Sequence, residues 1–194
     1  MISMKKTLFS CLAAAMPFLS AGIGQAATLG DVTAVPSPSA VSSIPAFGFT
    51  VADGLLFGFS GPTVADPGGI PSVLTSSGVD LGEGHVTGMV LGPVSPGPLL
   101  LAGSYEDSAV TAPGVVQALF LKAGGSLAGD YGGDYLLLTL TATAGPISLL
   151  GTASYVGTAV LTGAELDGIV PLPAGGVLLG SALVLVALRR RKAG

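Results

Sequence analysis

Short apolar runs, interrupted every few residues by Gly, Pro, Ser and Thr, fill the middle of this 194-residue chain. No such run between residues 27 and 167 reaches the roughly 18 residues of a membrane-spanning helix. The clearest run, YLLLTLTATA, alternates, so that every second residue shares one face. Its apolar face holds Leu136, Leu138, Leu140 and Ala142, and its wetter face holds Tyr135, Thr139, Thr141 and Thr143, with Leu137 as the exception. Short strands without an amphipathic helix predict an all-β body.

Turn signals divide the body into about seven strands. Asp53-Gly54 lies between two alternating runs and predicts a two-residue hairpin, because both residues tolerate positive φ. In that register Phe49 lies opposite Gly58, and Phe59 lies opposite Gly48. Further strands are expected at His85–Leu91, Leu99–Tyr105, Val115–Leu121, Tyr135–Ala144 and Gly151–Leu161. This spacing favours an antiparallel β-sandwich over residues 46–168.

The segment before the sandwich, residues 27–45, contains VPSPSAVSSIP. Such Pro/Ser-rich sequence predicts an extended linker or a first, irregular edge segment.

Residues 1–26 have the organisation of a secretory signal peptide. Lys5 and Lys6 precede an apolar stretch, and Gly24-Gln25-Ala26 is a small-x-small cleavage site. We expect a signal helix here and cleavage between Ala26 and Ala27. The single cysteine, Cys11, then leaves with the signal; the alternative, lipid attachment at Cys11, lacks the small residues that such a site needs before the cysteine.

Charge is distributed unevenly along the chain. Between residues 27 and 167 one lysine, Lys122, stands against all eleven carboxylates, which gives a formal charge of −10. This charge repels phosphate backbones and anionic lipid headgroups. Nucleic acid is therefore excluded as a partner.

The C-terminal segment, residues 169–194, predicts a transmembrane helix and a basic tail. Residues 170–188 carry no charge and are just long enough to span a bilayer. Pro171 and Pro173 fit at the start of a helix, where an amide hydrogen has no partner to lose. The cations that follow, Arg189, Arg190, Arg191 and Lys192, hold that end in the cytoplasm while the signal peptide exports the body. A buried core helix, the alternative, does not explain four consecutive cations.

A sorting motif opens this segment: Val170, Pro171, Leu172, Pro173 and Ala174, followed by two glycines. With the apolar run and the Arg cluster, it resembles the VPLPA-CTERM tail, a variant of the PEP-CTERM tails of Gram-negative, exopolysaccharide-producing bacteria. The resemblance implies processing by an exosortase, a membrane-embedded enzyme that recognises the motif and supplies the catalytic groups.

The same residues also look like the Leu-Pro-x-Thr-Gly signal of Gram-positive sortases. There a threonine carbonyl becomes the acyl donor, and in this chain Gly175 stands at that position. The missing threonine and the absence of a spacer before the apolar run favour the exosortase interpretation.

Residues able to do chemistry are few. His85 is the only histidine, so one chain cannot supply two imidazoles to a metal. No Gly-x-Ser-x-Gly motif occurs, and Ser60 in GFSGP lacks the second glycine. We therefore expect no enzyme activity and no cofactor.

The acidic residues offer one further kind of site. Asp130 and Asp134 in AGDYGGDY are candidate calcium ligands together with backbone carbonyls, and Glu106-Asp107 is a second close pair. Solvated turn carboxylates are the alternative. Tyr131 and Tyr135 are candidates for stacking on sugar rings or for packing.

Two functional classes follow. The first is an exported, noncatalytic cell-surface or extracellular-matrix protein; its partners are signal peptidase and the secretion machinery, an exosortase-type enzyme, the membrane through the C-terminal helix, and exopolysaccharide as a candidate ligand. The precursor is anchored in the inner membrane with its body in the periplasm, before release to the cell surface or beyond. The second is a secreted carbohydrate-binding module or hydrolase that uses acidic residues.

Overall fold

The computed structural model describes residues 27–42 and 47–167, most of which lie in strands. A short 3-10 helix, η2 (Leu29–Asp31), precedes nine strands. These are β1 (Val32–Val41), β2 (Phe47–Ala52), β3 (Leu55–Ala65), β4 (Ile70–Asp80), β5 (His85–Pro93), β6 (Leu101–Ala112), β7 (Val115–Gly124), β8 (Tyr135–Ala142) and β9 (Thr152–Leu166). Among the described residues, no helix has both the length and the apolar character that crossing a membrane requires. The expected signal helix and C-terminal helix lie outside these residues.

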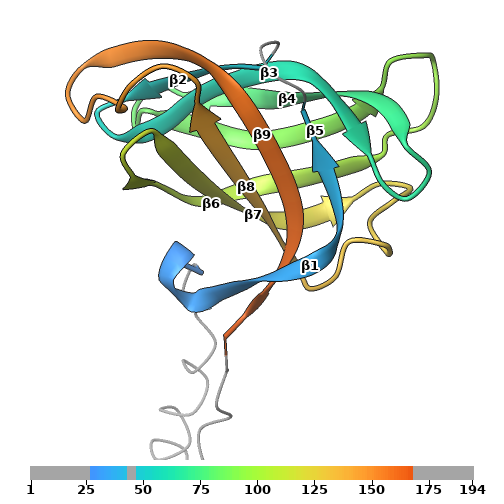
Figure 1. Ribbon diagram of the computed structural model, residues 1–194. Helices are drawn as coiled ribbons and strands as arrows, with labels where there is room; N and C mark the ends of the chain where they lie inside the picture. Colours follow the sequence, from blue (N-terminus) through green and yellow to red (C-terminus); the bar gives the residue numbers. More distant parts are fainter. Residues whose placement is uncertain (1–26, 43–46, 168–194) are drawn as a thin grey trace, which may run out of the picture.

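The strands form one closed antiparallel barrel, so the expectation of a β-sandwich is wrong (Figure 1). β2 to β9 pair in chain order, and β2 then pairs with β9, which closes a ring of eight strands. The closing ladder runs from Phe47 opposite Gly157 to Ala52 opposite Thr152. A barrel and a sandwich both bury one face of each strand, so the alternation of apolar residues cannot distinguish them.

β1 lies within the segment that the sequence predicted to be an extended linker or a first, irregular edge segment. β1 lies between β9 and the end of β3, with Val41 opposite both Val160 and Val64. β2 occupies the same position between β9 and β3 further along. β1 and β2 are therefore two pieces of one interrupted barrel strand. The β1–β9 register shifts between Ala34 and Ser39, around two prolines that have no amide hydrogen to donate.

The described body begins and ends at the same end of the barrel, which we call the terminal end (Figure 1). There the Asp167 amide donates to the carbonyl oxygen of Asp31 at 2.7 Å, and Val32 pairs with Leu166. Because the strands alternate in direction, the β3–β4, β5–β6 and β7–β8 connections also lie at this end. The other four connections lie at the opposite, distal end.

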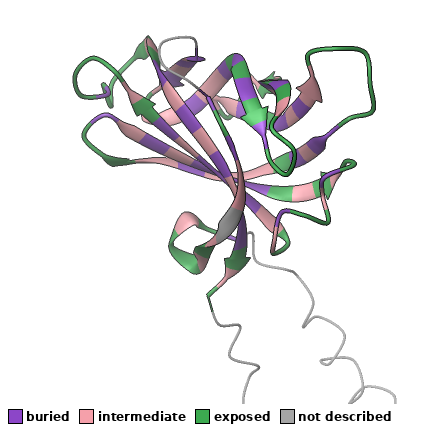
Figure 2. Ribbon diagram, turned by 45° about the vertical axis from the view of Figure 1, so that its right-hand side comes forward, coloured by how far each residue is buried: buried purple, intermediate pink, exposed green. Residues whose placement is uncertain are grey.

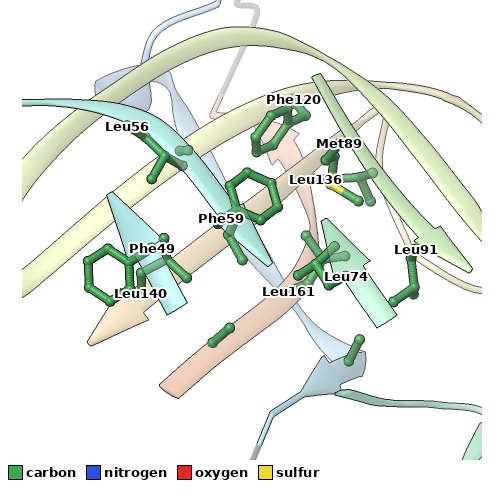
Figure 3. Packing of buried hydrophobic residues seen from close by; sticks show 14 of the residues in the cluster. Phe49, Leu56, Phe59, Leu74, Met89, Leu91, Phe120, Leu136, Leu140 and Leu161 are labelled. Carbon is green, nitrogen blue, oxygen red and sulfur yellow. The ribbon is translucent and has the colours of Figure 1, made fainter. Parts of the chain in front are cut away.

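Inward side chains fill the barrel. Buried and more exposed residues alternate along the strands (Figure 2), and the buried side chains of different strands meet in the interior (Figure 3). The rings of Phe59 and Phe120 lie 6.2 Å apart, in an edge-to-face arrangement. Leu136, Leu138 and Leu140 are fully buried, which confirms the face expected from their alternation. The interior is therefore a packed apolar core.

The hairpin at Asp53-Gly54 is confirmed, with φ of 48° and 85° at its two turn residues. Its expected register is wrong by one residue, because a bulge lies between Thr50 and Val51. Phe49 pairs with Phe59, not with a glycine.

Candidate functional site

A shallow groove of about 580 Å³ crosses the outer face of the barrel over β9, β2, β3 and β4. We call it the hydroxyl groove. Gly48 and Gly58 lie along it because the bulge places both glycines on the outer face, opposite Ser60 and Thr50. Its lining includes five hydroxyl residues and, beside them, three aromatic residues and an exposed valine: Thr50, Ser60, Thr75, Ser76 and Ser154, with Phe49, Phe59, Tyr155 and Val156.

Packing does not require glycine at either position. A Cβ atom at Gly48 would come no closer than 3.8 Å to another heavy atom, and one at Gly58 no closer than 4.0 Å. Neither residue has a positive φ. At Gly157, by contrast, a Cβ would collide with the carbonyl oxygen of Thr141. Gly48 and Gly58 therefore keep the groove open without being needed for the fold.

The groove follows the line where β3 and β4 separate. Their ladder ends at Ser60 opposite Thr75. Beyond it, the Ser76 hydroxyl accepts a hydrogen bond from the Phe59 amide and donates one to the Phe59 carbonyl oxygen, both at 3.4 Å. On the other side the Thr50 and Ser154 hydroxyls lie 3.0 Å apart. Among the described lining residues none is charged, so the groove offers hydroxyl and backbone hydrogen bonds together with apolar contact at the exposed Val156.

A second hollow, of about 400 Å³, adjoins the groove toward the distal end. The two share Ser154, Tyr155 and Val156 of β9. The Tyr155 hydroxyl accepts a hydrogen bond from the Ser148 amide at 2.7 Å, and its ring stacks on that of Phe49. Tyr155 thereby joins the groove to the β8–β9 connection.

The calcium candidates Asp130 and Asp134 lie exposed in the β7–β8 connection. In the part of the chain that the structure describes, no group of three His, Cys, Asp or Glu side chains is placed to hold a metal. The backbone carbonyls of this connection already have a cation: Lys122 Nζ donates to the oxygens of Ala128, Tyr131 and Gly133. An ammonium therefore takes the oxygens that a calcium ion would need.

Tyr131 is only 1% exposed, so its ring does not face a sugar, and its hydroxyl has no hydrogen-bond partner among the described residues. Burial raises the pKa of Tyr131 to about 12, with Asp66 and Asp130 adding to the shift. Tyr135 is half-buried on the outer face of β8.

The other candidates have structural roles. His85 stacks on Tyr105 with ring centroids 4.2 Å apart, and its Nδ1 lies 2.7 Å from the Val86 oxygen. The Tyr105 hydroxyl lies 2.9 Å from Ser108 Oγ, which also accepts a hydrogen bond from the β3 backbone at 3.1 Å. Asp107 accepts a hydrogen bond from the Leu29 amide at 2.9 Å and so fastens η2 to β6. Glu106 is half-buried beside it.

Ser60 lies in the hydroxyl groove, although sequence analysis considered it only as a nucleophile. The sorting motif, the basic tail and Ala26 lie outside the described residues, whereas Ala27 is buried at the terminal end.

Family models, curated proteins and solved structures were all compared with this chain, and none of them matches it.

Proposed function

We propose that this protein is an exported, noncatalytic surface or matrix protein, sorted by its C-terminal segment and in contact with neutral polysaccharide through the barrel. The observation that carries the proposal is the order of residues 169–194: a VPLPA motif, an uncharged run and four cations. The exported body and the sorting segment then have separate roles.

The geometry of the body is compatible with this arrangement. Asp167 is hydrogen-bonded to Asp31, so the chain enters and leaves the barrel at one end. A precursor held in the membrane by residues 170–188 would keep its terminal end close to the bilayer. The distal end and its connections would point away from it.

The hydroxyl groove supports a neutral, hydroxyl-rich ligand such as exopolysaccharide. Its lining donates and accepts hydrogen bonds without charge, and the body's formal charge of −10 disfavours anionic polymers. Among the described residues that line the groove none is a carboxylate, so nothing there favours the hydrolase alternative, which needs a pair of acidic residues.

The sorting half of the proposal is tested by the C-terminal mass of the mature protein. Processing in the native host should remove Val177–Gly194, and deletion of the host's processing enzyme should preserve them. Replacing Pro171 and Pro173 by alanine should block processing but not export. An intact Gly194 in the native host would refute the sorting proposal.

The ligand half is tested by cosedimentation of the protein with the host's own exopolysaccharide. Gly48→Val with Gly58→Val fills the groove with side chains that suit strands, so binding should fall at least fivefold while the fold is kept. Gly92→Val is the matched control, because Gly92 is a strand glycine outside the groove with no heavy atom within 4 Å of an added Cβ. If the double variant Gly48→Val/Gly58→Val bound the polysaccharide as well as Gly92→Val does, the groove would be excluded as the contact.

A further inference from the structure

Two leucines on the outer face of the barrel are buried. Leu119 of β7 and Leu137 of β8 lie opposite one another, and each alternates with core residues of its own strand, so both point outward. Leu119 is nevertheless 0% exposed, and Leu137 is 9% exposed. Leu137 is also the leucine that interrupts the alternation of YLLLTLTATA. Outer leucines buried to this extent need a cover outside the sheet.

Residues 27–31, which we call the N-terminal strap, lie at this position. Within the strap, η2 contacts both β6 and β7. The Leu29 amide donates to Asp107 Oδ2 at 2.9 Å, and Asp107 is the β6 residue opposite Leu119. Ala27, the first residue of the strap, is only 5% exposed. The strap is therefore packed against the outer face of the barrel at Leu119.

Two carboxylates hold the strap in place. Asp31 Oδ2 accepts hydrogen bonds from the Thr28 hydroxyl at 2.7 Å and from the Thr28 amide at 3.3 Å. Asp107 is the second acceptor. Between residues 27 and 167 the only Lys or Arg is Lys122, whose ammonium donates to the β7–β8 connection. The body therefore brings no Lys or Arg of its own to the strap carboxylates.

Signal cleavage would add a cation at this place. Hydrolysis breaks the carbon–nitrogen bond between Ala26 and Ala27; water supplies the new carboxylate oxygen on Ala26 and a hydrogen on the Ala27 nitrogen. The resulting α-amine is mostly protonated at pH 7. One residue spans at most about 3.6 Å, and the Thr28 nitrogen is 3.3 Å from Asp31 Oδ2, so the ammonium lies within about 7 Å of that oxygen. This is shorter than the roughly 8 Å Debye length of physiological salt.

We propose that removal of the signal peptide latches the N-terminal strap, because the new α-ammonium of Ala27 pairs with Asp31. This latch rests on the export proposed above. In the precursor the same nitrogen is an uncharged amide, so the strap is held by its hydrogen bonds alone and opens more often. In the mature protein the ammonium adds an attraction to a carboxylate of a body whose formal charge is −10. Maturation thereby closes the cover over Leu119.

The test is amide exchange of the mature, nitrogen-15-labelled protein purified from its native host, after its N-terminal residue has been established by mass. Acetylation at about pH 6.5 modifies the α-amine before Lys122 and removes its charge, whereas reductive dimethylation adds similar bulk and keeps the charge. Acetylation should speed exchange of the Leu29 amide about threefold, as expected for one partly screened ion pair, and dimethylation should not. The Asp53 amide, bonded to the Gly151 oxygen at 3.0 Å in the distal turn, is the reference and should exchange equally in all samples.

A pair of variants separates the loss of charge from the added bulk. Asp31→Asn removes the partner carboxylate, and Glu83→Gln, in the exposed β4–β5 turn, removes a distant one as the matched control. Acetylation should have little effect on Leu29 exchange in Asp31→Asn and its full effect in Glu83→Gln.

Three results would refute the latch in a mature chain that begins at Ala27. These are equal changes of Leu29 exchange after acetylation and dimethylation, no change after acetylation, or an acetylation effect as large in Asp31→Asn as in Glu83→Gln. Each of them would leave the proposed function intact. A chain that keeps residues 1–26 would instead refute the processed export on which the latch rests.

Discussion

Lys122 is the only Lys or Arg between residues 27 and 167. Its ammonium donates hydrogen bonds to backbone carbonyl oxygens of the β7–β8 connection. Nζ donates to the carbonyl oxygen of Ala128 at 3.1 Å and to those of Tyr131 and Gly133. The same connection is tied to the start of β6, because the Leu127 amide donates to the Leu100 oxygen at 2.9 Å. The ammonium therefore holds together a connection that contributes Tyr131 to the core.

Replacing Lys122 by methionine keeps the apolar stem and removes the charge. A hydrogen bond to a charged group contributes about 1.5–3 kcal/mol. The bond to Gly133 is exposed, so water can replace it, whereas those to Ala128 and Tyr131 are partly buried. Counting the two partly buried bonds at the low end, we expect Lys122→Met to lower the free energy of unfolding by about 3 kcal/mol. That is a large share of the roughly 5–15 kcal/mol typical of a domain.

The assay is urea unfolding of the body, residues 27–167, followed by circular dichroism. Gln117→Met is the matched control, since Gln117 lies half-buried on the same strand and makes a single long hydrogen bond, 3.4 Å, to Thr139. We expect the control to lose less than about 1 kcal/mol. Amide exchange of residues 126–133 should accelerate in Lys122→Met alone. If Lys122→Met lowered the free energy of unfolding no more than Gln117→Met does, and left amide exchange of residues 126–133 unchanged, the role assigned to the ammonium would be refuted.

The remaining predictions concern the core, the glycines and metal. Tyr131→Phe should raise the free energy of unfolding by about 1–2 kcal/mol, because it removes a buried hydroxyl without a partner. Because burial raises the folded pKa of Tyr131 from 10.0 to about 12, the free energy of unfolding should not depend on this group below pH 10 and should fall as pH rises from 10 toward 12, a decline that should be smaller in Tyr131→Phe. Gly157→Ala should cost about 3 kcal/mol or more in urea unfolding, since its Cβ meets backbone, whereas Gly48→Ala should cost almost nothing. Calcium or EDTA at millimolar concentration should leave the thermal midpoint unchanged, because Lys122 already occupies the loop carbonyls.

The local sequence was sufficient to predict the positions of several strands. Alternation located β8, turn signals located β5 and β7 to within a few residues, and Asp53-Gly54 located the hairpin. These features depend on neighbours in the chain: a strand with one buried face needs period two, and a primed turn needs residues that accept positive φ.

β4 was not predicted as a strand, and β1 was predicted only as an extended linker or a first, irregular edge segment. β1 and β4 contain Pro36, Pro38 and Pro71, which normally argue against a strand. β1 tolerates its prolines where its pairing with β9 is interrupted, between Ala34 and Ser39. No local pattern indicates which amides a distant strand leaves unpaired.

The same limit applies to the site. Gly48 and Gly58 were visible as glycines that alternate with phenylalanines, but a single bulge at Phe57, opposite the step from Thr50 to Val51, decides that both lie on the outer face, along a groove. Lys122 looked like an isolated charge until folding brought three carbonyls around it.

The sequence by itself determined that the body is all-β, acidic and poor in catalytic groups, and it supplied the C-terminal motif on which the sorting proposal depends. Only the tertiary structure decided between sandwich and barrel, because that choice depends on β2 pairing with β9 across the length of the body. Burial of one strand face is satisfied equally well by both folds. Closure is decided by backbone hydrogen bonds between distant strands, which side-chain periodicity does not encode.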